Sequence, residues 1–279
     1  MRPKTILICL TTPEHAGTLL SVAVPLARKY NAHLIGLHTL EALVVYPGIA
    51  IHVPPETFVA FDESQKKSAE AISTIFSNHT RNEDFVSEFR LVKAESSSAV
   101  ERMIESARGA DLVIMAQEDK NSDRFDQRRA QAQVIRESGR PVLVVPHDYD
   151  GPEIGKNILL GWSDTREATR AAHDMLCIAD EGAELTVLRV QSASQEVLHD
   201  SDAIDVTEML SRHGLKPTLE YRDIVGDGIA QVLNTVAFEK GADMIVTGAF
   251  GHSKAFDFVI GATTFSLLKD HKVPVLFSK

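Results

Sequence analysis

The sequence predicts an α/β protein built from two copies of one domain. Three landmarks occur twice in the same order: an apolar run after lysine, a Gly-Ala-Asp motif leading into a second apolar run, and an apolar run after proline. Continuous apolar runs between amphipathic segments are typical of a parallel sheet covered by helices on both faces. The paired landmarks are Lys4-Thr-Ile-Leu-Ile-Cys and Lys156-Asn-Ile-Leu-Leu-Gly, Gly109-Ala-Asp-Leu-Val-Ile-Met and Gly241-Ala-Asp-Met-Ile-Val-Thr, and Arg140-Pro-Val-Leu-Val-Val and Val273-Pro-Val-Leu-Phe.

The first copy alternates apolar runs with segments of helical periodicity. The segment 13–30 is the clearest helix, because Pro13 suits a first turn and apolar residues from Ala16 to Ala27 recur on one face. The expected strands are 6–10, 33–39, 86–92, 112–116 and 142–145, and the expected helices are 13–30, 63–79, 96–108 and 128–137.

The second copy follows the same order of elements. Residues 146–155 contain two glycines and two aspartates, so they predict a linker and place the domains at 1–147 and 154–279. The expected strands are 158–161, 185–190, 218–222, 244–247 and 275–277, and the expected helices are 166–179, 203–213, 229–240 and 263–270.

The first copy carries about 19 extra residues before its second helix. The excess lies mostly in residues 43–61, which are apolar and interrupted by prolines. Two interpretations remain open: a loop folded over its own core, or a lid or protein-binding surface, because long loops in compact domains are often functional.

Composition excludes some classes of protein. The net charge of −10 argues against a general nucleic-acid binder, which needs a basic face. The apolar run 6–10 is too short for a membrane span or a signal peptide. Cys9 and Cys177 form no CxxC pair and are expected to be buried free thiols. We therefore expect a cytoplasmic protein without a membrane span.

The second copy has a glycine-spaced loop between its fourth strand and its last helix. Gly248, Gly251 and Gly261 permit positive φ and close approach of the backbone to a ligand. Unpaired backbone N–H groups and the helix dipole favour an anion at such a helix start. The loop therefore predicts a site for a nucleotide phosphate tail, although the alternative that the glycines only shape turns stays open.

The spacing Gly248-x2-Gly251-x9-Gly261 resembles the Gly-x2-Gly-x9-Gly-(Ser/Thr) ATP-binding signature of the universal stress protein family. The strand that begins Gly241-Ala-Asp, the ending Lys272-Val-Pro-Val-Leu and the segment Ile158-Leu-Leu-Gly-Trp-Ser-Asp-Thr-Arg-Glu-Ala also resemble that family. Because the likeness covers nearly the whole chain twice, the protein looks like a tandem, two-domain universal stress protein (UspA-like).

The resemblance implies two five-stranded parallel sheets of order 3-2-1-4-5, packed as a pseudo-twofold pair through strands 142–145 and 275–277. It also implies a stress-response regulator that binds ATP or another adenine nucleotide, with or without Mg²⁺, in the second domain. Two positions depart from the signature: Ser163 stands where an acidic residue often ends the first strand, and Ala262 follows the last glycine. The implied nucleotide-binding residues are Ser163, Val190, Thr247, Gly248, Gly251, Gly261, Ala262 and Thr263.

The first copy departs much further from the signature. Thr11 replaces the acidic residue, Ala116 and Asp119 replace the first two glycines, and Arg128 or Arg129 replaces the third. Carboxylates at 118 and 119 repel phosphates unless the arginines screen them. We therefore expect one nucleotide per chain, in the second copy only.

Other functions remain as alternatives. The chain has no Walker A motif and no Gly-x-Gly-x-x-Gly, and its histidines lack metal-ligand spacing. We therefore expect no strong catalytic activity; weak ATP hydrolysis involving His252 or Lys254 is one alternative. A second alternative is a scaffold protein without nucleotide that binds a protein partner through residues 43–61. A homodimer of chains is also compatible with the sequence.

Overall fold

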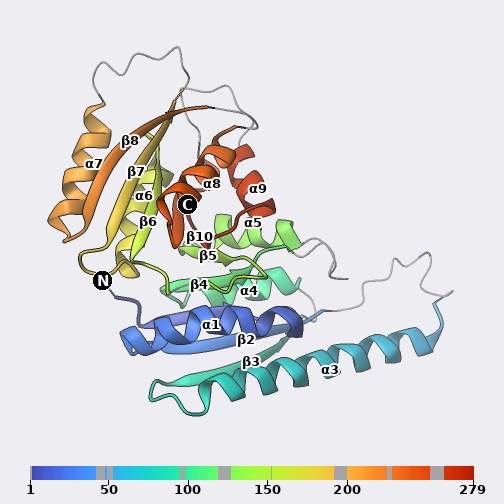
Figure 1. Cartoon of the computed structure of the whole chain (residues 1–279). Helices are drawn as coiled ribbons and strands as arrows, with labels where there is room; N and C mark the ends of the chain where they lie inside the picture. Colours follow the sequence, from blue (N-terminus) through green and yellow to red (C-terminus); the bar gives the residue numbers. More distant parts are fainter. Residues whose placement is uncertain are drawn as a thin grey trace.

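The computed structural model contains one continuous sheet of ten strands that runs through both copies (Figure 1). It describes residues 2–41, 48, 53–94, 98–118, 127–151, 153–191, 200–224, 228–251 and 261–279. The strand order is β3-β2-β1-β4-β5-β10-β9-β6-β7-β8. Each half has the order 3-2-1-4-5, so the predicted α/β fold with two tandem copies is confirmed.

The first half follows the predicted order of elements closely. The main difference is α3, which begins eight residues earlier than expected. The strands are β1 (Thr5–Cys9), β2 (His33–Leu40), β3 (Ser87–Lys93), β4 (Leu112–Ala116) and β5 (Val142–Val145), and the helices are α1 (Pro13–Tyr30), α3 (Pro55–Thr80), α4 (Ala99–Ala107) and α5 (Gln127–Glu137).

The second half repeats this pattern with shorter connections. Its first helix ends at Asp174, where a short 3-10 turn, Met175–Cys177, takes over. The strands are β6 (Asn157–Trp162), β7 (Glu184–Gln191), β8 (Lys216–Asp223), β9 (Met244–Gly248) and β10 (Val275–Ser278), and the helices are α6 (Arg166–Asp174), α7 (Ser201–Arg212), α8 (Ile229–Lys240) and α9 (Ala262–Lys269).

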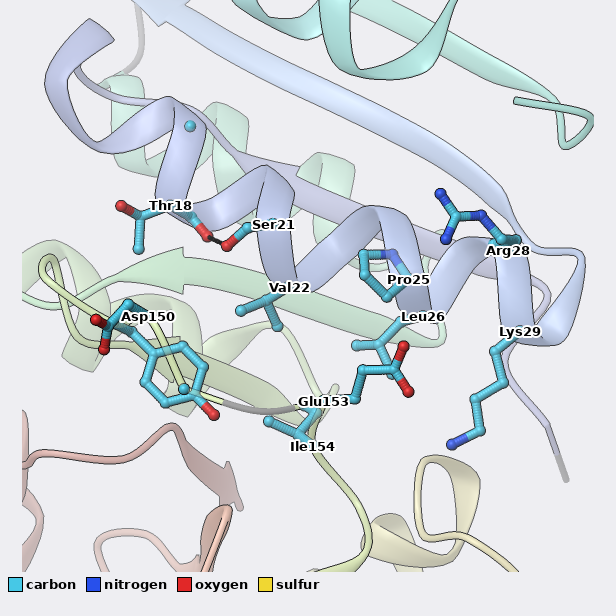
Figure 2. A pocket seen from close by; sticks show the side chains of 13 residues that line it. Thr18, Ser21, Val22, Pro25, Leu26, Arg28, Lys29, Asp150, Glu153 and Ile154 are labelled. Atoms are coloured by element: carbon cyan, nitrogen blue, oxygen red, sulfur yellow. Dashed lines mark hydrogen bonds between the residues drawn. The ribbon is translucent and has the colours of Figure 1, made fainter. Parts of the chain in front are cut away.

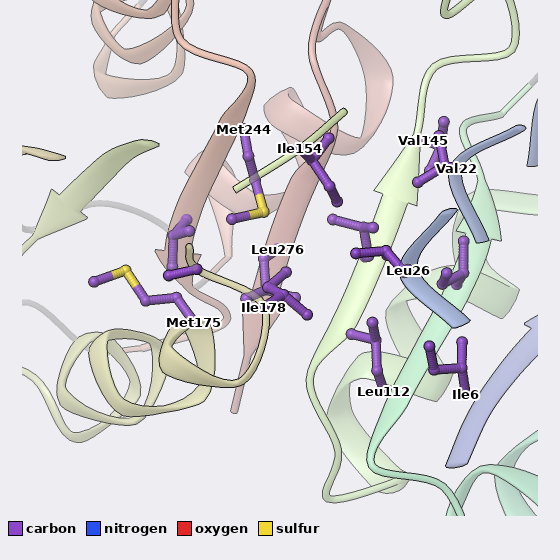
Figure 3. Packing of buried hydrophobic residues seen from close by; sticks show 14 of the residues in the cluster. Ile6, Val22, Leu26, Leu112, Val145, Ile154, Met175, Ile178, Met244 and Leu276 are labelled. Atoms are coloured by element: carbon purple, nitrogen blue, oxygen red, sulfur yellow. The ribbon is translucent and has the colours of Figure 1, made fainter. Parts of the chain in front are cut away.

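Helices cover both faces of the sheet, and each face has one apolar core that extends across both halves. On one face α1, α3, α6 and α7 pack on the sheet, and on the other face α4, α5, α8 and α9 do so. Figure 3 shows the first core at the junction, where Val22 and Leu26 of α1 face Ile154 and Ile178 of the second half. The two halves therefore share their hydrophobic cores.

The halves join through the antiparallel pairing of β5 and β10. Val144 pairs with Val275, Leu143 with Leu276, and Val142 with Phe277, and all six residues are fully buried. Every other strand pair in the sheet is parallel. The predicted intrachain pairing of the last strands is therefore confirmed, and the carboxyl ends of the strands point to opposite edges of the sheet in the two halves.

Polar contacts reinforce this junction. The hydroxyl of Tyr30 donates a buried hydrogen bond of 2.9 Å to the carbonyl of Ile178, and Lys29 forms an ion pair with Asp180. Gln117 lies against His271, with 3.1 Å between Nε2 and Nδ1. Burial lowers the pKa of His271 to about 4, so this imidazole is neutral at physiological pH.

The repeated Gly-Ala-Asp motif has a structural cause. The carboxylate of Asp243 accepts hydrogen bonds from the backbone N–H groups of Gly155, Lys156 and Asn157, at 2.9, 2.8 and 2.7 Å. Asp111 does the same at the start of β1, where it accepts from residues 4 and 5 at 2.8 and 3.0 Å. Each aspartate accepts hydrogen bonds from backbone N–H groups at the start of a central strand, and these groups would otherwise lack a partner.

Helix α3 accounts for part of the extra segment of the first half. Residues 55–61, expected as part of an insertion, form its first two turns, while residues 42–47 and 49–52 lie outside the described part of the chain. The N-terminal half of α3 extends past the sheet (Figure 1), and its buried residues begin only at Ala69. Phe58 and Val59 are 38% and 56% exposed. No described helix has the length and apolar character that a membrane crossing requires.

We expect Asp243→Ala to lower the free energy of unfolding by about 3 kcal/mol, because three backbone donors lose a charged acceptor. Equilibrium urea unfolding followed by circular dichroism measures this change. Asp111→Ala is the matched control and should cost less, because Asp111 accepts two hydrogen bonds and is less buried. A wild-type unfolding midpoint for Asp243→Ala would contradict this explanation of the motif.

Candidate functional site

The candidate site lies at the carboxyl ends of β6 and β9, where the strand order of the second half reverses. This is the place where open α/β sheets bind ligands. Thr247 and Gly248 end β9, and Ser163 follows β6. Val190 lies on β7, one residue beyond Arg189, the last residue of that strand paired with β6. Gly261 precedes α9, whose first residues are Ala262 and Thr263.

Gly248 packs against the first turn of α6. A Cβ atom at Gly248 would lie 2.5 Å from the backbone nitrogen of Ala168, so no other residue fits without displacing α6. A Cβ atom at Gly251 would lie 3.0 Å from Oε2 of Glu167 and 3.5 Å from Oγ1 of Thr165. Neither glycine has a positive φ, so close approach rather than a left-handed backbone is what glycine allows at these two positions. Close packing is the physical reason for glycine at 248.

Gly261 has a left-handed conformation, which glycine permits, with φ of 86°. It is the N-cap residue of α9, and no side chain of the described residues caps this helix. A Cβ atom at Gly261 would lie 2.7 Å from Cδ1 of Phe250. The backbone at Gly261 therefore lies close to the Phe250 ring. Because glycine has no side chain to act as a cap, the N-cap residue itself supplies no side-chain acceptor for the first N–H groups of α9.

Phe250, which no sequence pattern indicated, connects the loop to α9 and to the end of β10. It has φ of 54°, which is uncommon for a residue with a side chain. Its N–H donates to Oγ1 of Thr264 at 3.1 Å, and its carbonyl accepts from Nζ of Lys279 at 3.0 Å. Thr264 is buried, and Thr263 is the half-buried hydroxyl at the helix start.

Glu167 and Lys279 form an ion pair beside the loop, with 3.2 Å between Nζ and Oε1. Burial opposes ionisation of Glu167, but a backbone hydrogen bond and the Lys279 ammonium outweigh it, so the pKa of this carboxyl lies below its ordinary value. The pair neutralises a carboxylate next to Gly251. No sequence pattern indicated Lys279, which directly follows β10.

A polar cluster lies at the ends of β6 and β7, next to Ser163 and Val190. Arg189 forms ion pairs of 3.1 Å with both Asp200 and Asp202, and the indole of Trp162 donates to Asp202 at 3.0 Å. Burial raises the pKa of Asp200, which faces Asp202. The cluster fixes the wall of the site on the β7 side.

Ser163 lies near the glycine loop through one intermediate residue, whereas Val190 lies farther from it. The hydroxyl of Ser163 lies 3.1 Å from that of Thr165, which faces Gly251. Val190 stands two strands away from β9 at the same sheet edge. Residues 252–260, with His252 and Lys254, lie outside the described residues. Among the described residues no group of three or more His, Cys, Asp or Glu is placed to hold a metal ion.

The first half has a cavity of about 310 Å³ at the equivalent position, on the opposite edge of the sheet. It brings together Thr11, Ala116 and Arg129, three of the counterparts expected from the sequence. Gln131, only 2% exposed, donates through Nε2 to the carbonyl of Ala116 at 2.5 Å. Asp119 and the side chain of Arg128 lie outside the described residues.

Helix α4 beside this cavity is capped by its own residues. The Ser98 hydroxyl accepts from the N–H of Glu101 at 3.2 Å, and the Glu101 carboxylate accepts from the N–H of Ser98 at 2.8 Å. This capping box satisfies donors that an anion would otherwise use. The counterpart of α4 in the second half is α8, whose N-cap residue Gly228 makes no side-chain hydrogen bond to the helix. The counterpart of α9 is α5, and the residues that precede α5 lie outside the described part of the chain.

A second, larger cleft of about 590 Å³ lies between α1 and the connection of the halves (Figure 2). Val22, Leu26 and Ile154 form its apolar floor. Its basic residues are engaged elsewhere, since Arg28 pairs with Glu83 and Lys29 with Asp180. The cleft lies beside α1, away from the glycine loop, and no sequence motif predicted it.

Comparison with known families agrees with the repeated fold. The sequence profile described as the Universal stress protein family matches residues 3–146 and again residues 155–279. The chain belongs to the universal stress protein family. The predicted tandem resemblance is therefore confirmed. No curated relative matches the sequence significantly.

Solved structures of universal stress proteins share this two-copy fold. One from Archaeoglobus fulgidus DSM 4304 is 15% identical, has a TM-score of 0.73, and is matched over 98% of this chain and 96% of its own. A putative universal stress protein from Pseudomonas aeruginosa UCBPP-PA14 is 16% identical, has a TM-score of 0.61, and is matched over 99% of this chain and 93% of its own. At these identities the likeness concerns the fold.

We expect Gly248→Ala in this universal stress protein to lower the free energy of unfolding by about 1 to 3 kcal/mol, because its Cβ atom overlaps the backbone of α6. Thermal unfolding measures the change. Gly109→Ala is the matched control, since its Cβ atom meets nothing closer than 3.8 Å and its φ is not positive. Equal stability of the two variants would show that close packing is not what requires glycine at 248.

Proposed function

We propose that this protein is an adenine-nucleotide-binding regulator of the stress response in the cytoplasm, and that its second domain (154–279) holds ATP or a related nucleotide. The observation that carries the proposal is the start of α9. Gly261 turns the chain with φ of 86° at the carboxyl edge of the sheet, and no described side chain caps the helix. Exposed N–H groups and a positive helix dipole attract phosphate.

The residues present fit the ligand. Backbone N–H groups of Ala262 and Thr263 would hold the outer phosphates, and the Thr263 hydroxyl would replace the serine or threonine of the family signature at 262. Thr247, Gly248 and Gly251 would line the ribose and first phosphate, with Ser163 opposite them. The backbone of Val190 would face the adenine. Mg²⁺, when present, would accompany the phosphates.

Charges near the loop support the same proposal. The carboxylate of Glu167 faces Gly251, where it would repel a phosphate, but Lys279 neutralises it. In the first domain (1–147), Ala116 and Asp119 stand at the positions of Gly248 and Gly251, and the carbonyl of Ala116 accepts a hydrogen bond from Gln131. We therefore propose one nucleotide per chain and no nucleotide in the first domain.

A second candidate function is binding of a protein partner through the segment 43–61. The exposure of Phe58 and Val59 on the part of α3 that extends past the sheet favours it. This candidate needs no nucleotide, so the binding experiment that tests the first proposal separates the two. Slow ATP hydrolysis would also require nucleotide binding first.

We expect a fluorescent ATP analogue to bind the wild-type protein and unlabelled ATP to displace it. Gly261→Glu should weaken binding by about tenfold or more, because a carboxylate then faces the phosphates at the start of α9. Thr263→Val, which keeps the shape of the side chain, should weaken binding by about 3- to 10-fold through loss of one hydrogen bond. Fluorescence anisotropy measures both changes.

Gly214→Glu is the matched control. Gly214 has φ of 85° in the turn between α7 and β8, so this variant introduces the same charge at a positive φ away from the loop, without the contact that a Cβ atom at 261 makes with Phe250. It should bind the analogue like the wild type. Thr263→Val adds no Cβ atom near Phe250 and therefore tests the phosphate position separately from that contact. Absence of wild-type binding at millimolar analogue, or unchanged binding in Gly261→Glu, would refute nucleotide sensing and leave the protein-binding candidate.

A further inference from the structure

One side chain of the first domain reaches the glycine loop of the second. The guanidinium carbon of Arg136, in the last turn of α5, lies 3.8 Å from the centroid of the Phe250 ring. It lies 5.8 Å from the ring of Phe265 in α9. The two rings pack edge to face, with 5.5 Å between centroids and 72° between planes. A cation over an aromatic face at such a distance is attracted by the ring.

The β5–β10 pairing explains how a residue of the first domain arrives there. The two strands are antiparallel, so the amino end of β5 lies beside the carboxyl end of β10. Helix α5 runs back toward the amino end of β5 and therefore ends at the edge of the sheet where the second domain has its glycine loop. Arg136 stands at that end of α5, and α5 contacts α9.

Arg136 closes the outer side of the Phe250 ring. Phe250 is only 3% exposed, whereas Arg136 itself is exposed to solvent. Phe250 in turn fixes the backbone on both sides of the loop. Its ring occupies the space in which a Cβ atom of Gly261 would lie, and its N–H is bound to Thr264. The ring thus connects Arg136 with the start of α9.

We propose that Arg136 is a positioning residue for the nucleotide site of the second domain. It holds Phe250, and through Phe250 it holds Gly261 and the first turn of α9 in the arrangement that presents backbone N–H groups to phosphate. The site is then shared between the domains, although every group that touches the ligand belongs to the second. This inference rests on the proposed function for the ligand, but the contact with Phe250 can be tested without it.

A double-mutant cycle tests the contact. The proteins are the wild type, Arg136→Met, Phe250→Leu and the double variant. Arg136→Met keeps an apolar cover and removes the cation, and it should weaken binding of the fluorescent ATP analogue by about 3- to 10-fold. In the Phe250→Leu background the same change should have less than about a twofold effect, because the ring it acts through is gone.

Amide hydrogen exchange in the protein without nucleotide is the second measurement. Exchange at Phe250 and Gly251 should be about 3- to 10-fold faster in Arg136→Met than in the wild type, with no further increase from this change in the Phe250→Leu background. The urea midpoint of global unfolding should stay the same. This readout reports on the loop alone, whether or not a nucleotide binds.

Arg140→Met is the control for charge. Arg140 precedes β5 at the same edge of the sheet and donates to the carbonyl of Arg108 at 2.9 Å. It should leave both measurements unchanged. Two results would show long-range attraction of phosphate and overturn the proposal. One is that Arg136→Met weakens binding of the analogue equally in the wild-type and Phe250→Leu backgrounds. The other is that Arg140→Met weakens binding as much as Arg136→Met does. Unchanged exchange in Arg136→Met would also overturn it. Faster exchange without any nucleotide binding would refute the proposed function and support the positioning of Phe250.

Discussion

The antiparallel pairing of β5 with β10 is the constraint on which the rest of the structure depends. Three fully buried residue pairs join two parallel half-sheets into one sheet, and the apolar cores on both faces continue across the junction. Because this is the one antiparallel contact among the described strands, the parallel strands of one half run opposite to those of the other. A single chain thereby forms an interface that would otherwise need two chains, and the covalent connection gives it a high effective concentration.

The pairing places the carboxyl ends of the parallel strands of the two halves at opposite edges of the sheet and brings the end of each last helix to the other half's edge. Arg136 of α5 reaches Phe250, and on the other side His271, just beyond α9, reaches Gln117. The domains have diverged at these edges. The first has a cavity beside which Gln131 donates to the carbonyl of Ala116, and the second has Gly248 packed against α6 and Gly261 at the start of α9.

Much of this fold could be predicted from the sequence, because apolar runs and helical periodicity are local signals. Helix α1 begins at Pro13 as expected. Helix α3 begins at Pro55, a proline that suits a first turn. Because this proline lies in an apolar run that contains several prolines, the sequence predicted a loop there and a helix only from residue 63. In the site, the glycine spacing marked positions where positive φ or close approach is possible, and the structure shows positive φ at Gly261 and close approach to the backbone of α6 at Gly248. Phe250 and Arg136 were missed because a left-handed phenylalanine and an interdomain contact leave no local pattern.

The central claim is that the two domains share one fold but not one function, with the nucleotide held by the second domain alone. Native mass spectrometry of the intact chain with saturating ATP tests this claim most directly, since it counts ligands on each molecule. We expect one added nucleotide mass per chain. A second nucleotide per chain at the same concentration, or none, would contradict it.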